Sequence, residues 1–109
     1  MPPTALGDLE LAVLLSVARL GDDAYGGSVR RDVSQRAGHD YSVGAVYTTL
    51  QRLEDKGFLR SWMGEPTPVR GGRARRCFRV TATGARALER AREVRNALWR
   101  GVDPEPRPT

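Results

Sequence analysis

Arginine is concentrated in one stretch of this 109-residue chain, between Glu65 and Glu89, where no acidic residue occurs. The stretch carries Arg70, Arg73, Arg75, Arg76, Arg79 and Arg86. A planar guanidinium group can bind two phosphate oxygens, or the edge of guanine, through paired hydrogen bonds. The formal net charge of +5 also suits an anionic partner. The clustering therefore indicates phosphate chemistry, although any single arginine could simply be a solvated charge.

A second group of candidate residues lies between Ser42 and Lys56, where apolar residues recur at helical spacing. The residues predicted to face the core are Val43, Val46, Tyr47, Leu50 and Leu53. The opposite face is small, polar and weakly charged near its N-terminal end, so the helix axis can approach a flat or grooved partner closely. The candidates for contact with base edges or backbone are Ser42, Gly44, Ala45, Thr48, Thr49 and Arg52.

Other chemistries find little support in the residue types. The chain has one histidine, His39, and one cysteine, Cys77, so it cannot assemble a standard tetrahedral zinc site alone. It lacks a Walker loop, a dinucleotide fingerprint and a nucleophile elbow. We therefore expect no enzyme activity, no cofactor and no metal. Cys77 is either a redox-sensitive thiol or, as we favour, an inert strand residue.

The same composition also indicates the cellular compartment. A single cysteine excludes a disulfide within the chain, which is consistent with the cytoplasm. The longest apolar run, Leu11–Leu15, is far too short to cross a bilayer, so we expect no membrane association.

These candidates need helices and a hairpin to position them. A first helix is predicted from about Asp8 to Leu20, and it is apolar on nearly every side. A domain of this size can cover only part of it. We expect the remaining face to meet another chain, the alternative being that the helix is central within the monomer. That face carries Leu11, Leu14, Leu15 and Ala18.

A second helix is predicted from about Ala24 to Ala37, with an N-cap in the turn that ends at Asp23. Gly26 and Gly27 weaken its start. They indicate either close approach to a neighbouring helix or phosphate, or a frayed first turn.

Two short strands follow the helix that ends at Lys56–Gly57. They are predicted at Leu59–Met63 and Arg76–Val80. The segment 64–75 between them, rich in glycine, proline and arginine, is expected to be a flexible basic hairpin tip.

Thr81 is predicted to cap a last helix that runs to about Arg100. This helix follows the hairpin and has little of the domain core left to cover, so we expect it to mediate dimerisation. Its apolar stripe consists of Leu88, Ala91, Val94, Leu98 and Trp99.

The order of elements is that of a winged helix-turn-helix, a mainly α (α+β) fold with three helices, a two-stranded wing and a C-terminal dimerisation helix. The boundaries we expect are a tail at 1–6, a DNA-binding domain at 7–81, the helix at 82–101 and a disordered tail at 102–109. A homodimer would read a pseudo-palindromic operator in double-stranded DNA. The alternative is a winged-helix module that binds protein or RNA, but the basic wing and small polar helix face favour DNA.

Three segments resemble a known family. The segment 43–57, VGAVYTTLQRLEDKG, is similar to the recognition helix of PadR-type transcriptional regulators. Segments 71–73 and 77–84 resemble that family's wing and the start of its final helix, and Leu20–Tyr25 resembles its first inter-helix turn. The resemblance covers about residues 6–90, with Cys77 where the family often has an aromatic residue.

The resemblance implies a homodimeric repressor of nearby genes, of the short subclass with a single C-terminal helix. It implies that Arg70, Arg73 and Arg75 contact phosphates or the minor groove, and that the Tyr47 hydroxyl can reach a phosphate unless the ring only packs in the core. In some members an aromatic effector binds at the dimer interface against a tryptophan of the last helix. Trp99 could take that role, although packing of the dimer is the interpretation we favour.

Overall fold

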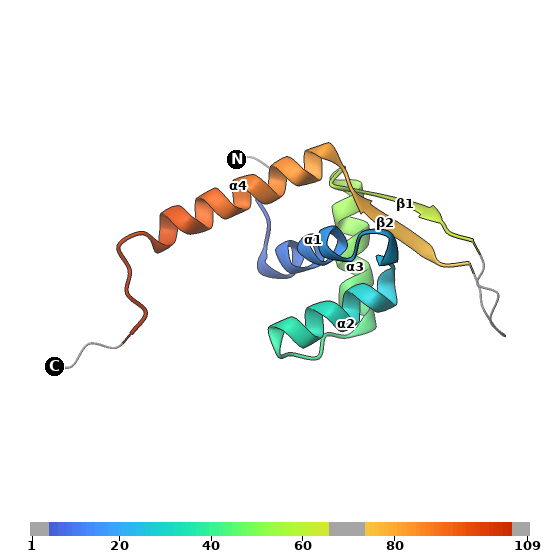
Figure 1. Ribbon diagram of the computed structural model, residues 1–109, viewed down its shortest axis with the longest axis horizontal. Coiled ribbons are helices and arrows are strands. Elements are labelled where there is room, and N and C mark those ends of the chain that lie inside the picture. The colour runs from blue at the N-terminus through green and yellow to red at the C-terminus, as the bar shows by residue number, and fades with distance from the viewer. Residues whose placement is uncertain (1–4, 66–73, 106–109) are drawn as a thin grey trace.

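The computed structural model describes residues 5–65 and 74–105 (Figure 1). The elements in chain order are α1 (Asp8–Leu20), the 3-10 helix η1 (Gly21–Asp23), α2 (Gly26–Ala37), α3 (Val43–Asp55), β1 (Leu59–Met63), β2 (Arg76–Val80) and α4 (Ala82–Trp99). Helices α1, α2 and α3 form the body of the molecule, while the hairpin and the end of α4 extend away from it in opposite directions (Figure 1). This arrangement confirms the predicted winged helix-turn-helix with a C-terminal helix.

The core lies where α1, α2 and α3 meet. Val13, Leu14 and Val17 of α1 are at most 1% exposed. They belong to one apolar cluster with Val29 and Val33 of α2 and with Val46, Leu50 and Leu53 of α3. Leu6 also joins this cluster, although the sequence placed it in an N-terminal tail. The cluster holds α3 by one face only, so its other face stays exposed.

The start of α2 differs from the prediction. Tyr25, with extended backbone, is the N-cap, and the helix begins at Gly26. The Ser28 hydroxyl accepts a hydrogen bond from the Tyr25 amide at 3.0 Å and donates to the Asp23 carbonyl at 2.6 Å. The predicted N-cap in the turn ending at Asp23 was therefore wrong, because η1 occupies residues 21–23 and Ser28 supplies the capping oxygen.

A glycine turn joins α3 to the wing. Gly57 has a φ of 81°, its amide donates to the Glu54 carbonyl at 2.9 Å, and the Phe58 amide donates to the Leu53 carbonyl at 2.9 Å. This pair of hydrogen bonds is a Schellman motif, which glycine favours because L side chains rarely adopt positive φ. The turn directs Phe58, 1% exposed, into the core and starts β1 at the next residue.

The two strands pair antiparallel in the register Leu59↔Val80 to Met63↔Arg76, as the predicted strand bounds require. Leu59 and Phe78 are buried. A third backbone segment joins β2 at its other edge: Tyr25 forms a bridge with Cys77, and the Phe78 amide donates to the Ala24 carbonyl at 3.0 Å. The base of the wing is thereby attached to the start of α2.

Helix α4 begins beside the same glycine turn. The Thr81 hydroxyl caps it by accepting from the Gly84 amide at 3.0 Å, and the Thr81 amide donates to the Phe58 carbonyl at 3.0 Å. A Cβ at Gly84 would overlap that carbonyl oxygen. Among the described residues, no helix is long and apolar enough to cross a membrane.

Replacing two helical glycines by alanine should therefore change the free energy of unfolding in opposite directions. We expect Gly84→Ala to lower the free energy of unfolding by about 1–3 kcal/mol, because the new methyl group meets rigid backbone. Gly44→Ala is the matched control, since a Cβ there meets nothing within 4 Å, and it should raise stability by up to about 1 kcal/mol. Urea denaturation of both variants measures this, and equal effects would contradict the tight contact at Gly84.

Candidate nucleic-acid interface

The exposed face of α3 is the first part of the candidate interface. The Ser42 hydroxyl caps the helix by accepting from the Ala45 amide at 3.1 Å. Beyond the cap, the face forms an open concavity of about 480 Å³ lined by Tyr47, Thr48, Gln51, Arg52 and Asp55. Gly44 and Thr48 are exposed and small, as the sequence suggested. The N-terminal half of α3 thus presents a surface of short side chains that can enter a groove.

One predicted contact residue is not available. Thr49 is 4% exposed, and its hydroxyl donates to the Ala45 carbonyl at 2.8 Å. The prediction that Thr49 contacts DNA was wrong, because its side chain packs toward the core and its hydrogen bond is used within the helix. Ser42, Gly44, Thr48 and Arg52 are exposed, and Ala45 is half-buried.

Two residues that the apolar pattern assigned to the core are exposed instead. Val43 is 54% exposed and Tyr47 is 48% exposed. Both lie at the edge of the buried stripe, and the neighbouring elements do not extend far enough to cover them. Gln51 is also exposed on this face, although its amide donates to the Asp55 carboxylate at 2.9 Å. Val43 and Gln51 therefore join the surface that a groove would meet.

Gly26 explains how the Tyr47 ring is placed. A Cβ at Gly26 would overlap the hydroxyl and ring atoms of Tyr47, so the ring packs directly on the first turn of α2. Of the two interpretations of Gly26, the close approach to a neighbouring helix is confirmed.

A small hollow joins α2, α3 and the base of the wing. It measures about 350 Å³ and is lined by Tyr25, Gly26, Gly27, Tyr47, Ala74, Arg75 and Arg76. The Arg75 guanidinium lies 4.3 Å from the centroid of the Tyr25 ring, whose hydroxyl accepts a hydrogen bond from Arg31 at 2.9 Å. A guanidinium, a phenol hydroxyl and a helix start around one hollow provide donors that suit a phosphate group.

The wing arginines are not equivalent. Arg70 and Arg73 lie outside the described residues. Arg76 forms an ion pair with Glu54 of α3 at 2.7 Å, and Arg79 pairs with Asp22. Within residues 5–65 and 74–105, Arg75 forms no ion pair, so its charge is the least neutralised of these three.

Arg52 lies on the side of α3 that faces the start of α1. Burial raises the pKa of the Glu10 carboxyl, but a 2.7 Å hydrogen bond from Lys56, one from the Gly7 amide, and the charges of Lys56 and Arg52 together bring that pKa below its ordinary value. Arg52 therefore acts on Glu10 while its own side chain remains exposed. Among the described residues, no group of three or more metal-binding side chains occurs.

Comparison with known proteins decides the family. The model of the transcriptional regulator PadR-like family matches residues 14–90. The chain is also similar to transcriptional regulator Rv3488 of Mycobacterium tuberculosis, with 37% identity over 81 residues that cover 74% of this chain and 71% of the relative. The chain belongs to the PadR-like family. Family and fold together make it a DNA-binding transcriptional regulator.

Solved structures agree with the fold of this PadR-like regulator. A Streptococcus transcriptional regulator is similar with a TM-score of 0.68 and 28% identity, covering 83% of each chain. A PadR family transcription regulator from Clostridium difficile R20291 is similar with a TM-score of 0.64 and 23% identity, covering 86% of this chain and 88% of that one.

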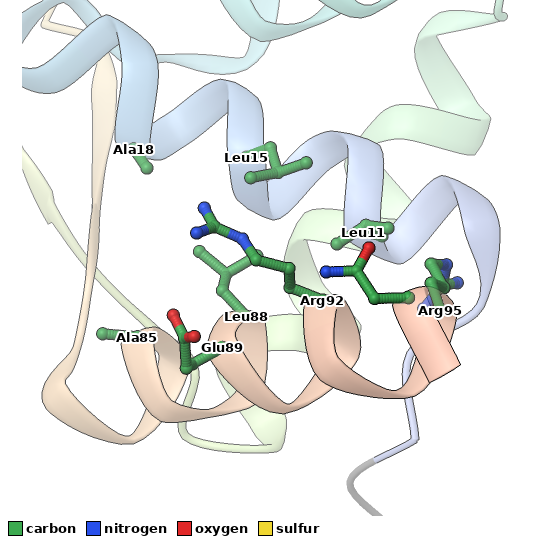
Figure 2. Close-up of a pocket in the computed structure, with 9 residues that line it drawn as sticks. Leu11, Leu15, Ala18, Ala85, Leu88, Glu89, Arg92 and Arg95 are labelled. Atoms are coloured by element: carbon green, nitrogen blue, oxygen red, sulfur yellow. The ribbon is translucent and has the colours of Figure 1, made fainter. Parts of the chain in front are cut away.

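A second surface of the PadR-like regulator lies between α1 and α4. Figure 2 shows side chains of α1 facing those of α4 across a groove of about 550 Å³. The groove is lined by Leu11, Leu15, Ala18, Ala85, Leu88, Glu89, Arg92, Arg95 and Asn96. At its far end, Arg95 donates to the Leu6 carbonyl at 3.1 Å and to the Asp8 carboxylate at 3.2 Å.

The predicted dimer residues divide into two groups. Leu14 is 0% exposed and Ala91 is 7% exposed, because both pack in the core of the chain itself. Their assignment to a surface between chains was wrong. The remaining residues line the groove or are exposed on the distal half of α4, where Leu98 is 73% and Trp99 is 59% exposed.

The contact between α2 and α3 predicts an energetic coupling. We expect Gly26→Ala to cost about 1–3 kcal/mol of stability when Tyr47 is present, because the added methyl displaces the ring. In a Tyr47→Ala background the same change should cost much less. A double-mutant cycle in urea gives the coupling energy directly. Additive effects would show that the Tyr47 ring does not rest on Gly26.

Proposed function

We propose that this PadR-like regulator is a homodimeric repressor that binds a pseudo-palindromic operator near the genes it controls, in the cytoplasm. One observation carries the proposal: the low exposed face of α3 lies beside the hollow that contains Arg75 and Tyr47. A helix that enters the major groove needs neighbouring donors for the phosphates at the groove edge, and this surface offers both together.

Each side chain then has a role that its position supports. Thr48 and Arg52 reach base edges, and Ser42, Gly44 and Ala45 lie at the end of α3 that goes deepest. Tyr47 and Arg75 contact phosphates from the hollow. Arg70 and Arg73 extend the phosphate or minor-groove contacts of the wing, on the resemblance alone. None of these roles requires enzymatic chemistry.

The homodimer is supported by the groove between α1 and α4. Leu15 of α1 is 40% exposed inside a mostly apolar groove, and Val94, Leu98 and Trp99 leave an apolar stripe uncovered on α4. A second copy could insert its own stripe beside this groove, and two-fold symmetry would then bury both faces at once. The residues we assign to this interface are Leu11, Leu15, Ala18, Leu88, Val94, Leu98 and Trp99.

Trp99 allows a regulatory role at the same interface. Its ring is largely exposed in the single chain, so a partner or a small aromatic effector could cover it. We favour packing against the partner as its main role, and an effector that competes for this ring would then weaken operator binding.

The role of Arg75 is tested by salt dependence. We expect Arg75→Ala to weaken binding to specific and random duplexes alike, and to reduce the slope of log affinity against log salt by about one unit. Arg90→Ala is the matched control, because Arg90 is exposed on α4 beside a separate hollow near Phe58. Fluorescence anisotropy across a salt series measures both. An unchanged slope in Arg75→Ala would remove it from the phosphate contacts.

Introducing a charged side chain into the groove tests the proposed dimer surface. Leu15→Glu should shift the chain toward monomer, because a carboxylate in a mostly apolar groove loses hydration without gaining a partner. Ala37→Glu, at an exposed position that ends α2, is the control and should leave the oligomeric state unchanged. Sedimentation velocity distinguishes the species, with circular dichroism to show that both variants fold. A Leu15→Glu variant that stays dimeric would place the interface elsewhere.

A further inference from the structure

Val43 is the first residue of α3 and the most exposed large apolar side chain of that helix. It directly follows the Ser42 cap, whose hydrogen bond to the Ala45 amide fixes this turn of the helix. The side chain is 54% exposed, although valine usually prefers burial. A solvated valine at a helix start is the simple explanation, but its position is where recognition helices meet base edges.

The surroundings of Val43 limit what it could recognise. Its neighbour Gly44 adds no side chain, and a Cβ there would meet nothing within 4 Å. The Tyr47 ring, one turn further along, is held against Gly26. The Val43 side chain itself has no polar atom. A base edge that approaches this point therefore meets two methyl groups and open space beside them.

Only one feature of a base in the major groove suits such a partner. Thymine presents a 5-methyl group there, whereas the other bases present hydrogen-bonding atoms that an apolar contact would leave unsatisfied. We propose that Val43 is a specificity-determining residue that packs against a thymine methyl group in the operator. This inference rests on the proposed placement of α3 in the major groove.

The size of the effect can be estimated. Burying one methyl-sized group contributes roughly 0.8 kcal/mol, which corresponds to about a fourfold change in affinity. The contact would therefore tune sequence preference and would not supply the bulk of the affinity, which comes from phosphates.

The experiment removes this methyl group alone. Duplexes that bind the full chain are first enriched from a pool of random sequence, and one is chosen as the probe. Each thymine of the probe is then replaced in turn by deoxyuridine, which lacks only the 5-methyl group. We expect one thymine, or a symmetry-related pair, at which the replacement weakens binding about fourfold in an anisotropy titration.

Variants of the protein show which side chain causes the loss of affinity for the uracil probe. Val43→Ala should bind the thymine and uracil probes equally at the sensitive position. Val102→Ala changes an exposed valine beyond α4 and should keep the fourfold difference. Thr48→Ser removes the methyl group of a proposed base-contacting residue and tests whether that group causes the loss instead.

The outcomes are separable. If the probe is bound specifically but no thymine-to-deoxyuridine replacement weakens binding, the role of Val43 is overturned and the proposed function stays intact. Sensitivity that survives in Val43→Ala but disappears in Thr48→Ser would overturn it as well. Failure to enrich any sequence would overturn both this inference and specific operator binding.

Discussion

The turn that follows α3 is the contact on which the rest of the structure depends. Its left-handed glycine, Gly57, lets the chain reverse, and Phe58 enters the core with its amide bonded to the end of α3. The Phe58 carbonyl accepts the Thr81 amide, and Gly84 packs against the same carbonyl. Helix α3, the wing and α4 therefore meet at one buried residue, whose contacts orient them relative to one another.

This junction relates two surfaces that would otherwise be independent. The core joins α1, α2 and α3, and Phe58, Leu59, Phe78 and Ala91 extend it to the wing and α4. Two of the exposed surfaces are one face of α3 and the groove between α1 and α4 with the distal half of α4. A partner bound at α4 would thus set the distance and angle between two copies of α3, because the start of α4 and the end of α3 are joined by hydrogen bonds at Phe58 and Thr81.

The elements were predictable because they depend on local signals: helical periodicity, the caps at Ser42 and Thr81, and alternation in the strands. Periodicity gives the direction of a side chain around a helix but not how far its neighbours extend. For this reason Thr49 and Leu14 were assigned to surfaces, and Val43 to the core. The contact of Gly26 with Tyr47 joins residues far apart in the sequence, so the glycine signalled a close approach without identifying its partner.

In the proposed homodimer, one unit presents α3 and the base of the wing to DNA, twice and symmetrically. Hydroxyl-radical footprinting of the enriched duplex with the full chain tests it most directly. We expect two equal protected regions on one face of the duplex, about one helical turn or a whole multiple of turns apart. A single protected region, or two at a spacing that puts them on opposite faces, would contradict it.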